Sequence, residues 1–145
     1  MGQFRLERSS LERFSLGQFS LARALLAERN STMDCIFCKI IAGEIPSEKV
    51  YETADVLAFR DIHPVAPVHV LVIPKTHVAS IQTLTADTLP LVTALHVAIQ
   101  AVATQEGIAE QGYRVIANCG EGAGQTVPHL HYHVIGGRRL GERLL

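Results

Sequence analysis

The segment GQTVPHLHYHVIGG, residues 124–137, decides how this chain of 145 residues is interpreted. Its centre alternates histidine with apolar or aromatic residues, and a period of two residues is typical of a strand. We therefore expect His131 and His133 on the same side of a strand, roughly 7 Å apart, and Leu130, Tyr132 and Val134 on the other side. One face of this strand carries imidazoles, and the reverse belongs to a core.

A glycine-rich loop comes directly before the histidines. It contains Gly120, Gly122 and Gly124, followed by Gln125 and Thr126. The backbone N–H groups of such a loop can surround an anion, so a phosphate would lie between the loop and the histidines. An HxH pair alone could equally be a metal site or two ordinary polar positions. Three alternating histidines after this loop, with further histidines at positions 69 and 77, favour a functional site at which the histidines act on a bound phosphate.

Outward from this segment, the apolar pattern predicts an α+β domain. Short apolar and β-branched runs indicate strands at residues 50–51, 55–59, 68–73, 113–117 and 130–135. Residues 35–42 are predicted as a short helix, and residues 89–106 as the one long helix because apolar residues recur there every 3.6 positions. Strands that mostly follow one another along the chain favour a mainly antiparallel sheet of about five strands.

Composition limits the partners that we expect. The formal net charge is −1 and the basic residues are spread along the chain, so a nucleic-acid partner is not expected. Because no apolar run approaches about 20 residues, no membrane association is expected either. Three cysteines are too few for a disulfide framework, and the C-x-x-C pair Cys35 and Cys38 suits metal or redox chemistry in a reducing compartment. A cytoplasmic location is the corresponding expectation.

The composition changes near Met33. Residues 1–32 carry five Arg and three Glu, a net charge of +2, whereas residues 33–145 carry eight basic and eleven acidic residues, a net charge of −3. Residues 10–24 contain the degenerate repeat SLERF, SLGQF, SLARA. We predict that residues 1–32 lie outside the fold and that residues 33–145 form the domain. The extension could be a segment upstream of a natural start at Met33, a targeting peptide, or an amphipathic helix that docks on a partner.

This arrangement resembles the histidine-triad (HIT) family over nearly all of residues 34–139. The triad pattern H-φ-H-φ-H-φ-φ is present at residues 129–135. The stretches CIFCKIIAGEIPSEKVYE from Cys35, AFRDIHPVAPVHVLVIPKTH from Ala58 and GQTVPHLHYHVIGG from Gly124 are similar to the Hint-like branch. The resemblance implies a HIT-like α+β fold that pairs into a homodimer. It also implies hydrolysis or transfer of nucleoside phosphoramidates, adenylates or dinucleoside polyphosphates. The alternative is a nucleotide-binding regulatory or scaffold protein with incidental turnover.

The resemblance further implies roles for individual residues. His131 is the nucleophile that attacks the alpha-phosphorus and forms a nucleotidyl-histidine, which water then cleaves. The implied catalytic set is His131, His133, His69, which orients the triad, and Thr126, which helps to protonate the leaving group. The implied contacts with a purine nucleotide are Ile36, Phe37, Ile40 and Phe59 around the base, Asp61 and Ile62 at the ribose, and Asn118, Gly124, Gln125, Thr126, His131 and His133 at the phosphate. From spacing alone, the four residues around the base could equally be plain core.

Two further features follow from the resemblance. In zinc-bearing HIT proteins the C-x-x-C pair is completed by two histidines, which here are His77 and His129, and a closed Cys₂His₂ site would hold a structural zinc ion. The redox alternative for Cys35 and Cys38 stays open. The tail after Arg139 reads LGERLL, which departs from the Trp-Pro-rich end common in Hint-type proteins, so the leaving group is not specified.

Overall fold

The computed structural model describes residues 21, 23–26 and 34–144. The chain divides into two units, Met1–Asp34 and Cys35–Leu145. In the first unit, residues 21 and 23–26 are helical. The repeat and the three interpretations of residues 1–32 fall largely outside the described residues. The boundary between residues 32 and 33 therefore stays a prediction.

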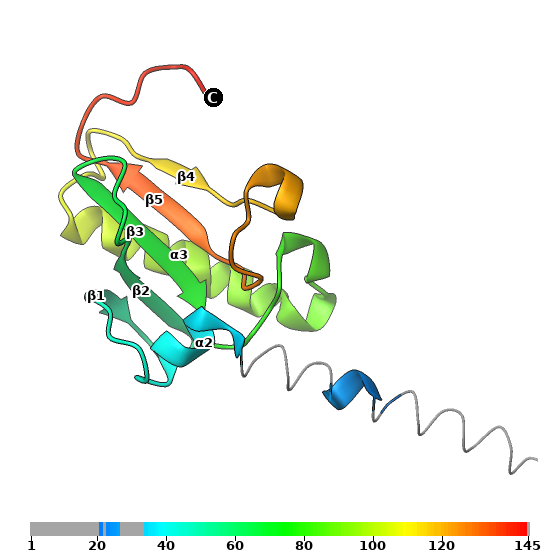
Figure 1. Ribbon diagram of the computed structural model, residues 1–145. Helices are drawn as coiled ribbons and strands as arrows, with labels where there is room; N and C mark the ends of the chain where they lie inside the picture. Colours follow the sequence, from blue (N-terminus) through cyan, green and yellow to red (C-terminus); the bar gives the residue numbers. More distant parts are fainter. Residues whose placement is uncertain (1–20, 22, 27–33, 145) are drawn as a thin grey trace, which may run out of the picture. The chain divides into compact units, whose positions relative to one another are not determined.

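The second unit is built on a five-stranded sheet (Figure 1). The strands are β1 (Lys49–Glu52), β2 (Val56–Arg60), β3 (Val68–Pro74), β4 (Arg114–Ile116) and β5 (Tyr132–Gly136). Their order in the sheet is β1-β2-β3-β5-β4, and all four pairings are antiparallel. The predicted α+β class with its antiparallel sheet is confirmed.

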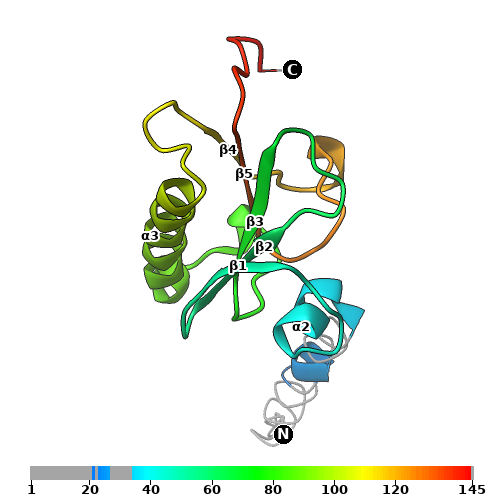
Figure 2. The same cartoon turned by 90° about the vertical axis from the view of Figure 1, so that its left-hand side faces the viewer.

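Helices lie on both faces of the sheet. The long helix α3 (Leu89–Gln105) covers one face, and the short helix α2 (Ile36–Ile41) lies on the other (Figure 2). The apolar stripe of α3 is buried against the strands, as its 3.6-residue spacing predicts. Its buried members are Leu95, Ala98, Ile99, Val102 and Ala103. Three 3₁₀ turns that were not predicted complete the unit: η1 (Ile81–Thr83), η2 (Ala86–Thr88) and η3 (Glu121–Ala123).

One premise of the argument from composition is wrong, although the expectation that it supported, no membrane association, stays a prediction. The helical stretch Ala86–Gln105 has 20 residues and a mean hydropathy of 1.4, so it is long and apolar enough to cross a membrane by length and composition alone. The premise rested on the lack of an uninterrupted apolar run, and polar residues such as His96 and Gln100 interrupt this stretch. Its mean hydropathy is high all the same. The core of a soluble protein passes the same test, and here Leu95, Ile99 and Val102 pack against the sheet.

The start of β5 differs from the prediction in a way that shapes the site. The strand begins at Tyr132, so His131 lies just before it rather than within it. The alternation persists across this boundary, because Leu130, Tyr132 and Val134 all belong to the core cluster that includes α3. The rings of His131 and His133 lie 5.1 Å apart between centroids, closer than the spacing of an extended strand provides.

Candidate active site

A cleft of about 440 Å³ opens on the sheet face opposite α3, because His69 alternates along β3 with Val68 and Val70, which belong to the core cluster that includes α3. We call it the histidine cleft because His69 of β3 and His133 of β5 line it. The other residues that line it are Val65, Arg114, Val115, Ile116, Asn118, Ile135 and Leu144. The sheet register brings these residues together, since His133 is paired with Leu71 of β3 and with Ile116 of β4.

His69 has a defined tautomer because the backbone group that contacts its Nδ1 is an N–H, which can only donate. The N–H of Val65 donates to Nδ1 of His69 over 3.2 Å, so Nδ1 carries a lone pair and the ring proton is on Nε2. His69 is buried, and burial lowers its pKa despite the opposing charge of Asp61. A proton on Nδ1 would place two donors, Nδ1–H and the N–H of Val65, opposite each other, which disfavours the charged ring. The imidazole is therefore held neutral.

The fixed proton of His69 sets the tautomer of His133 in turn. Nε2 of His69 lies 2.9 Å from Nδ1 of His133 and 3.3 Å from a carboxylate oxygen of Asp61. Because His69 Nε2–H donates, His133 Nδ1 accepts, and the ring proton of neutral His133 is on Nε2. Burial, together with His131 and His69, lowers the pKa of His133 to about 4. His133 is thus a neutral hydrogen-bond donor at neutral pH.

His131 has the opposite tautomer. Its Nδ1 lies 2.7 Å from the carbonyl oxygen of His129, and since a carbonyl only accepts, Nδ1 carries the proton. Nε2 is then left with a lone pair, which a nucleophile needs. The side chain is only 5% exposed, and its ring meets that of Phe37 edge-on at 5.3 Å. Packing on both sides fixes the direction of the ring.

The glycine-rich loop is braced by the side chain of Gln125. The backbone N–H of Gly120 donates to Oε1 of Gln125 over 2.8 Å, and Nε2 of Gln125 donates to the carbonyl oxygens of Ala79 and Val127. Gly124 has φ +80°, a left-handed conformation that favours glycine. Gln125 is thus engaged within the protein, while Thr126 is exposed. Their contacts with a phosphate stay predictions.

The residues expected around the nucleoside fall into two groups. Phe37, Ile40 and Phe59 are buried together in one apolar cluster, whereas Ile36 and Ile62 are 46% and 86% exposed. Phe37 joins this cluster to His131 through its ring contact. Asp61 accepts a hydrogen bond from the N–H of His63 on one oxygen and faces His69 with the other. The binding of a base and a ribose by these residues stays a prediction.

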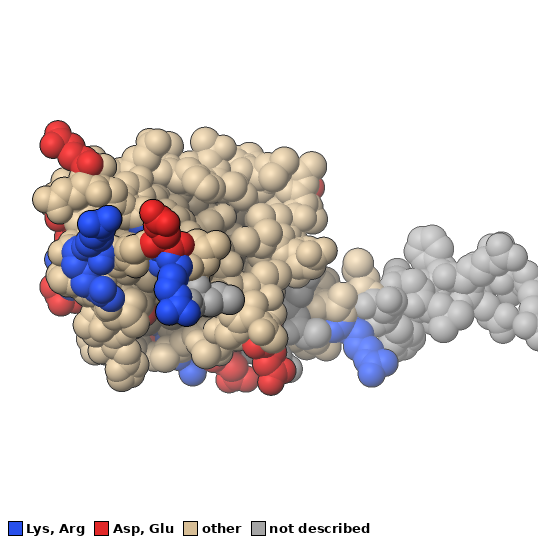
Figure 3. Space-filling model, turned by 90° about the horizontal axis from the view of Figure 1, so that it is seen from above, with Lys and Arg blue, Asp and Glu red and all other residues tan. Residues whose placement is uncertain are grey.

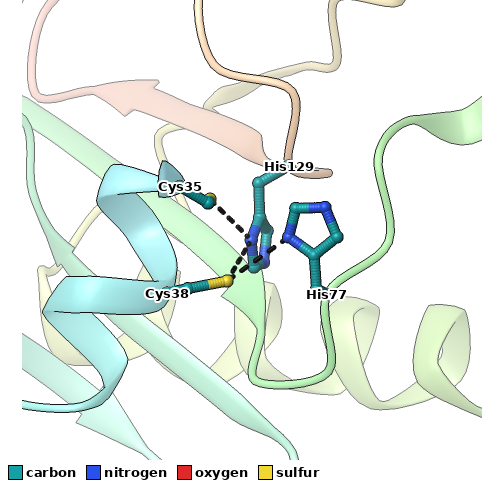
Figure 4. Close-up of side chains that lie close together, drawn as sticks. All are labelled: Cys35, Cys38, His77 and His129. Carbon is teal, nitrogen blue, oxygen red and sulfur yellow. Dashed lines mark hydrogen bonds between the residues drawn. The ribbon is translucent and has the colours of Figure 1, made fainter. Parts of the chain in front are cut away.

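A second cluster gathers Cys35, Cys38, His77 and His129, and we call it the Cys/His cluster (Figure 4). Their ligand atoms all lie within 4.8 Å of one another. Nδ1 of His129 is 3.4 Å from Sγ of Cys35 and 3.6 Å from Sγ of Cys38, and Nδ1 of His77 is 3.3 Å from Sγ of Cys38. Helix α2, the segment after β3 and the segment before β5 each contribute, so residues distant in sequence meet here.

The chemistry of this donor set fits a metal ion. Nε2 of His129 lies 2.8 Å from the carbonyl oxygen of Pro74 and must donate to it, so Nδ1 presents a lone pair to the two sulfurs. Burial lowers the pKa of His129 to about 4, which keeps it neutral as a ligand must be. Burial and the adjacent Cys35 raise the pKa of the Cys38 thiol to about 12. A divalent cation would reverse that effect by stabilising both thiolates.

Asp61, His69 and His133 form another set whose ligand atoms lie close together. A metal ion on Nε2 of His69 would move the ring proton to Nδ1, where the Val65 N–H already points. The same hydrogen bond that fixes the tautomer therefore disfavours a metal. Of the two sets of possible ligands in the described part of the chain, only the Cys/His cluster has tautomers that suit one.

Sequence reasoning missed the backbone groups that assign these tautomers and one side chain of the cleft. The N–H of Val65 and the carbonyl of Pro74 are backbone groups, so the identity of a residue in the sequence does not show that they contact a histidine. Arg114 lines the cleft because it pairs with Ile135 across β4 and β5. Its place at the start of a predicted strand was visible, but its register against β5 was not.

Comparison with known proteins agrees with this architecture. The HIT domain family matches residues 42–140. A purine nucleoside phosphoramidase of Escherichia coli is 44% identical over 111 residues, which cover 77% of this chain and 93% of that protein. A HIT-like protein of Synechococcus elongatus is 51% identical over 107 residues, covering 74% of this chain and 93% of that protein. A HIT family hydrolase from Clostridium thermocellum superposes with a TM-score of 0.76 at 50% identity, covering 77% of this chain and 97% of that one.

An antiparallel α+β sheet that presents neighbouring histidines beside a glycine-rich loop defines a class of hydrolase. The chain belongs to the HIT family and is a hydrolase of that family.

Proposed function

We propose that the protein cleaves nucleotides at the alpha-phosphate, with purine nucleoside phosphoramidates, adenylates or dinucleoside polyphosphates as substrates. The observation that carries the proposal is the pair of opposite tautomers on two histidines in ring contact, His133 in the histidine cleft and the adjacent His131. His131 offers a lone pair on Nε2, and His133 offers an N–H on Nε2. A phosphate between them meets a nucleophile and a hydrogen-bond donor at once. The relative named as a purine nucleoside phosphoramidase supports the same chemistry.

The first step forms a nucleotidyl-histidine. Nε2 of His131 attacks the alpha-phosphorus, a P–N bond to the protein forms, and the bond from phosphorus to the leaving group breaks. The leaving group takes up a proton, for which Thr126 is the proposed source. Nδ1–H of His131 stays bound to the carbonyl oxygen of His129 and stabilises the positive charge on the ring. The N–H of His133 and the loop amides hold the non-bridging oxygens.

The second step restores the enzyme. Water attacks the phosphorus and the P–Nε2 bond breaks, while the proton that the water loses replaces the one that Thr126 gave to the leaving group. The products are the nucleoside monophosphate and a neutral His131. The chain His69, His133 and phosphate keeps its direction of hydrogen bonding throughout, because the Val65 N–H prevents His69 from turning its proton inward. Asn118, which lines the cleft, is a further proposed contact for the phosphate.

We propose that the Cys/His cluster holds a structural zinc ion. Cys35, Cys38, His77 and His129 supply two sulfurs and two nitrogens, the set that tetrahedral zinc takes in closed sites. Such an ion would supply no reacting group. It would connect α2 to the segment that leads into β5, and so support His131 two residues further along the chain.

We also propose a homodimer. β4 is an edge strand, and its Val115 is 40% exposed on the sheet face that α3 partly covers. On α3, Val97 and Leu89 are 55% and 56% exposed. A second copy of this chain would cover these apolar side chains on the α3 side of the sheet. The substitution Val115→Asp should shift the protein to a monomer in sedimentation experiments, and a wild-type monomer would contradict the proposal.

The activity is tested with purified protein and adenosine 5′-phosphoramidate. We expect release of AMP and, after acid-free quenching of a short reaction, an increase in intact mass by one adenylyl group, located on His131. A protein that binds AMP but releases none from the phosphoramidate would instead be a nucleotide-binding scaffold.

A further inference from the structure

A second pocket, of about 230 Å³, lies beside the histidine cleft and is lined by three arginines, Arg114, Arg138 and Arg139. It is formed by the start of β4 and the segment after β5. Among the described residues that line it, none is acidic. Figure 3 looks down on the side where the C-terminal residues lie, and Lys and Arg side chains gather at one end of that face with Asp and Glu side chains beside them. We call this pocket the arginine pocket.

Two of the three guanidinium groups are anchored without being neutralised. Arg114 donates to the carbonyl oxygen of Gly141 over 2.9 Å, and Arg138 donates to the carbonyl oxygen of Val65 over 3.3 Å. Each guanidinium has five N–H donors, so most remain for a ligand. Within the described residues, the ion pairs involve other side chains, and none of these three arginines takes part in one. An anchored cation without a carboxylate partner suits an anion.

The arginine pocket adjoins the reacting centre. Arg114 lines both the pocket and the cleft. It is paired with Ile135, while His133 is paired with Ile116, so Arg114 and His133 are diagonal neighbours on one face of the sheet. Such neighbours have Cα atoms roughly 7–8 Å apart, which the long side chain of arginine can bridge. Arg138 is held by Val65, whose N–H fixes His69. A group bound in the pocket therefore lies a few bonds from a phosphorus beside His133.

We propose that the arginine pocket binds the anionic end of the leaving group. The inference rests on the proposed function, because it assigns the part of the substrate that departs from the alpha-phosphorus. The ligand class is an amine that carries a carboxylate or a phosphate a few bonds from the scissile nitrogen. Bidentate contacts of guanidinium groups recognise both anions. A neutral amine gains nothing from the pocket.

The test compares three adenosine 5′-phosphoramidates whose leaving amines share a two-carbon chain on the nitrogen and differ in the group at its end. The amines are ethylamine, which is neutral, β-alanine, which ends in a carboxylate, and phosphoethanolamine, which ends in a phosphate. For the wild-type enzyme we expect kcat/KM at least about tenfold higher for the anionic conjugates, as charge-assisted hydrogen bonds to exposed arginines provide. The preference should decrease with added salt because the pocket is open to solvent.

The double variant Arg138→Gln/Arg139→Gln should lose most of the preference, measured as the ratio of kcat/KM for each anionic conjugate to kcat/KM for the ethylamine conjugate of the same variant. Arg143→Gln removes a positive charge from the same tail outside the pocket and should keep the preference. Melting temperatures near that of the wild type would show that both variants fold. A preference for only one of the two anionic conjugates would assign the pocket to a carboxylate or to a phosphate.

Two outcomes overturn the inference, and they differ from failure of the proposed function. Equal kcat/KM for all three conjugates, with the ethylamine conjugate cleaved, would reject the arginine pocket alone. A preference that survives in the double variant would reject it as well. No cleavage of any conjugate, the ethylamine conjugate included, would reject the proposed function and this inference with it.

Discussion

The Cys/His cluster and the histidine cleft are neighbours along the chain, since His129 belongs to the cluster, His133 lines the cleft, and the ring of His131 contacts that of His133. The Cys/His cluster joins a buried cysteine and a buried histidine to two partly buried residues, whereas the cleft is open and lined by apolar side chains together with two histidines, an arginine and an asparagine. The three histidines differ in the group that meets their second nitrogen. The carbonyl of Pro74, the carbonyl of His129 and the N–H of His69 suit them to the proposed roles of ligand, nucleophile and hydrogen-bond donor. One residue type thus acquires three chemistries from its hydrogen-bond partners.

The sharpest way to break this comparison is to remove the proposed nucleophile. His131→Ala should lower turnover of adenosine 5′-phosphoramidate by several orders of magnitude, because no other group supplies the covalent intermediate. AMP should still bind within a few-fold of wild type, since the proposed ribose and phosphate contacts remain. Steady-state kinetics and calorimetry measure the two effects. His96→Ala, on the exposed side of α3, is the matched control, and near-normal turnover by His131→Ala would refute the assignment.

The Cys/His cluster should respond in stability rather than in turnover. Cys38→Ser, or removal of the metal by a chelator, should lower the melting temperature by more than about 10 °C, because a metal site that exists only in the folded chain adds its binding energy to folding. Activity at moderate temperature should fall far less. Elemental analysis should give about one zinc per chain. Cys119→Ser changes an exposed thiol outside the cluster and serves as the control.

A different result would revive the redox interpretation of the C-x-x-C pair. Protein purified without chelators that contains no metal, and in which Cys35 and Cys38 form a reversible disulfide, would contradict the zinc proposal.

The pH dependence of stability tests whether His133, in the histidine cleft, is neutral in the folded protein. His133 has its pKa lowered to about 4, whereas an unfolded histidine titrates near about 6.5. Between these values the unfolded chain binds more protons, so the free energy of unfolding rises with pH across this window and falls as the pH is lowered. His133 should contribute a loss of about 1–2 kcal/mol between pH 7 and pH 5. Thermal melts of wild type and His133→Gln measure it, and parallel curves would contradict a neutral His133.

The smallest effect is expected for the extension. A chain that begins at Met33 should keep the melting temperature within about 1–2 °C and the full activity, because a terminal segment that does not pack on the core contributes little to either. Differential scanning calorimetry and the phosphoramidate assay compare the two chains. A clear loss of stability would mean that residues 1–32 pack on the domain.

Sequence periodicity predicted the sheet and the long helix because both bury continuous apolar patterns. Val68–Pro74 is buried at every position, and α3 buries every third or fourth residue, so these elements stand out in the sequence. The turns at Ile81–Thr83 and Ala86–Thr88 were missed, since three residues are too few to show a period. Their capping boxes, Ser80 with Thr83 and Thr85 with Thr88, were a readable signal that the apolar pattern obscured.

The sequence predicted which side chains meet at the candidate site, but it did not predict the tautomers of the histidines. Alternation placed His131 and His133 together, and the resemblance assembled Cys35, Cys38, His77 and His129. Which nitrogen of each ring carries a proton depends on backbone groups such as Pro74 and Val65, whose positions follow from strand register and loop path. The arginine pocket depends on register in the same way, because Arg114 meets the cleft only through its pairing with Ile135.

The brace formed by Gln125 has a consequence for the entropy of binding. Its amide connects Gly120, Ala79 and Val127, and the N–H of Leu130 donates to the carbonyl oxygen of the adjacent Val78. The glycine-rich loop is thereby tied to the segment that carries His77 before any nucleotide arrives. Glycines otherwise lose more conformational freedom than other residues when a ligand orders them. Because this loop is ordered during folding, a phosphate bound as proposed would meet oriented amides, and the cost of ordering the loop would not be subtracted from its affinity.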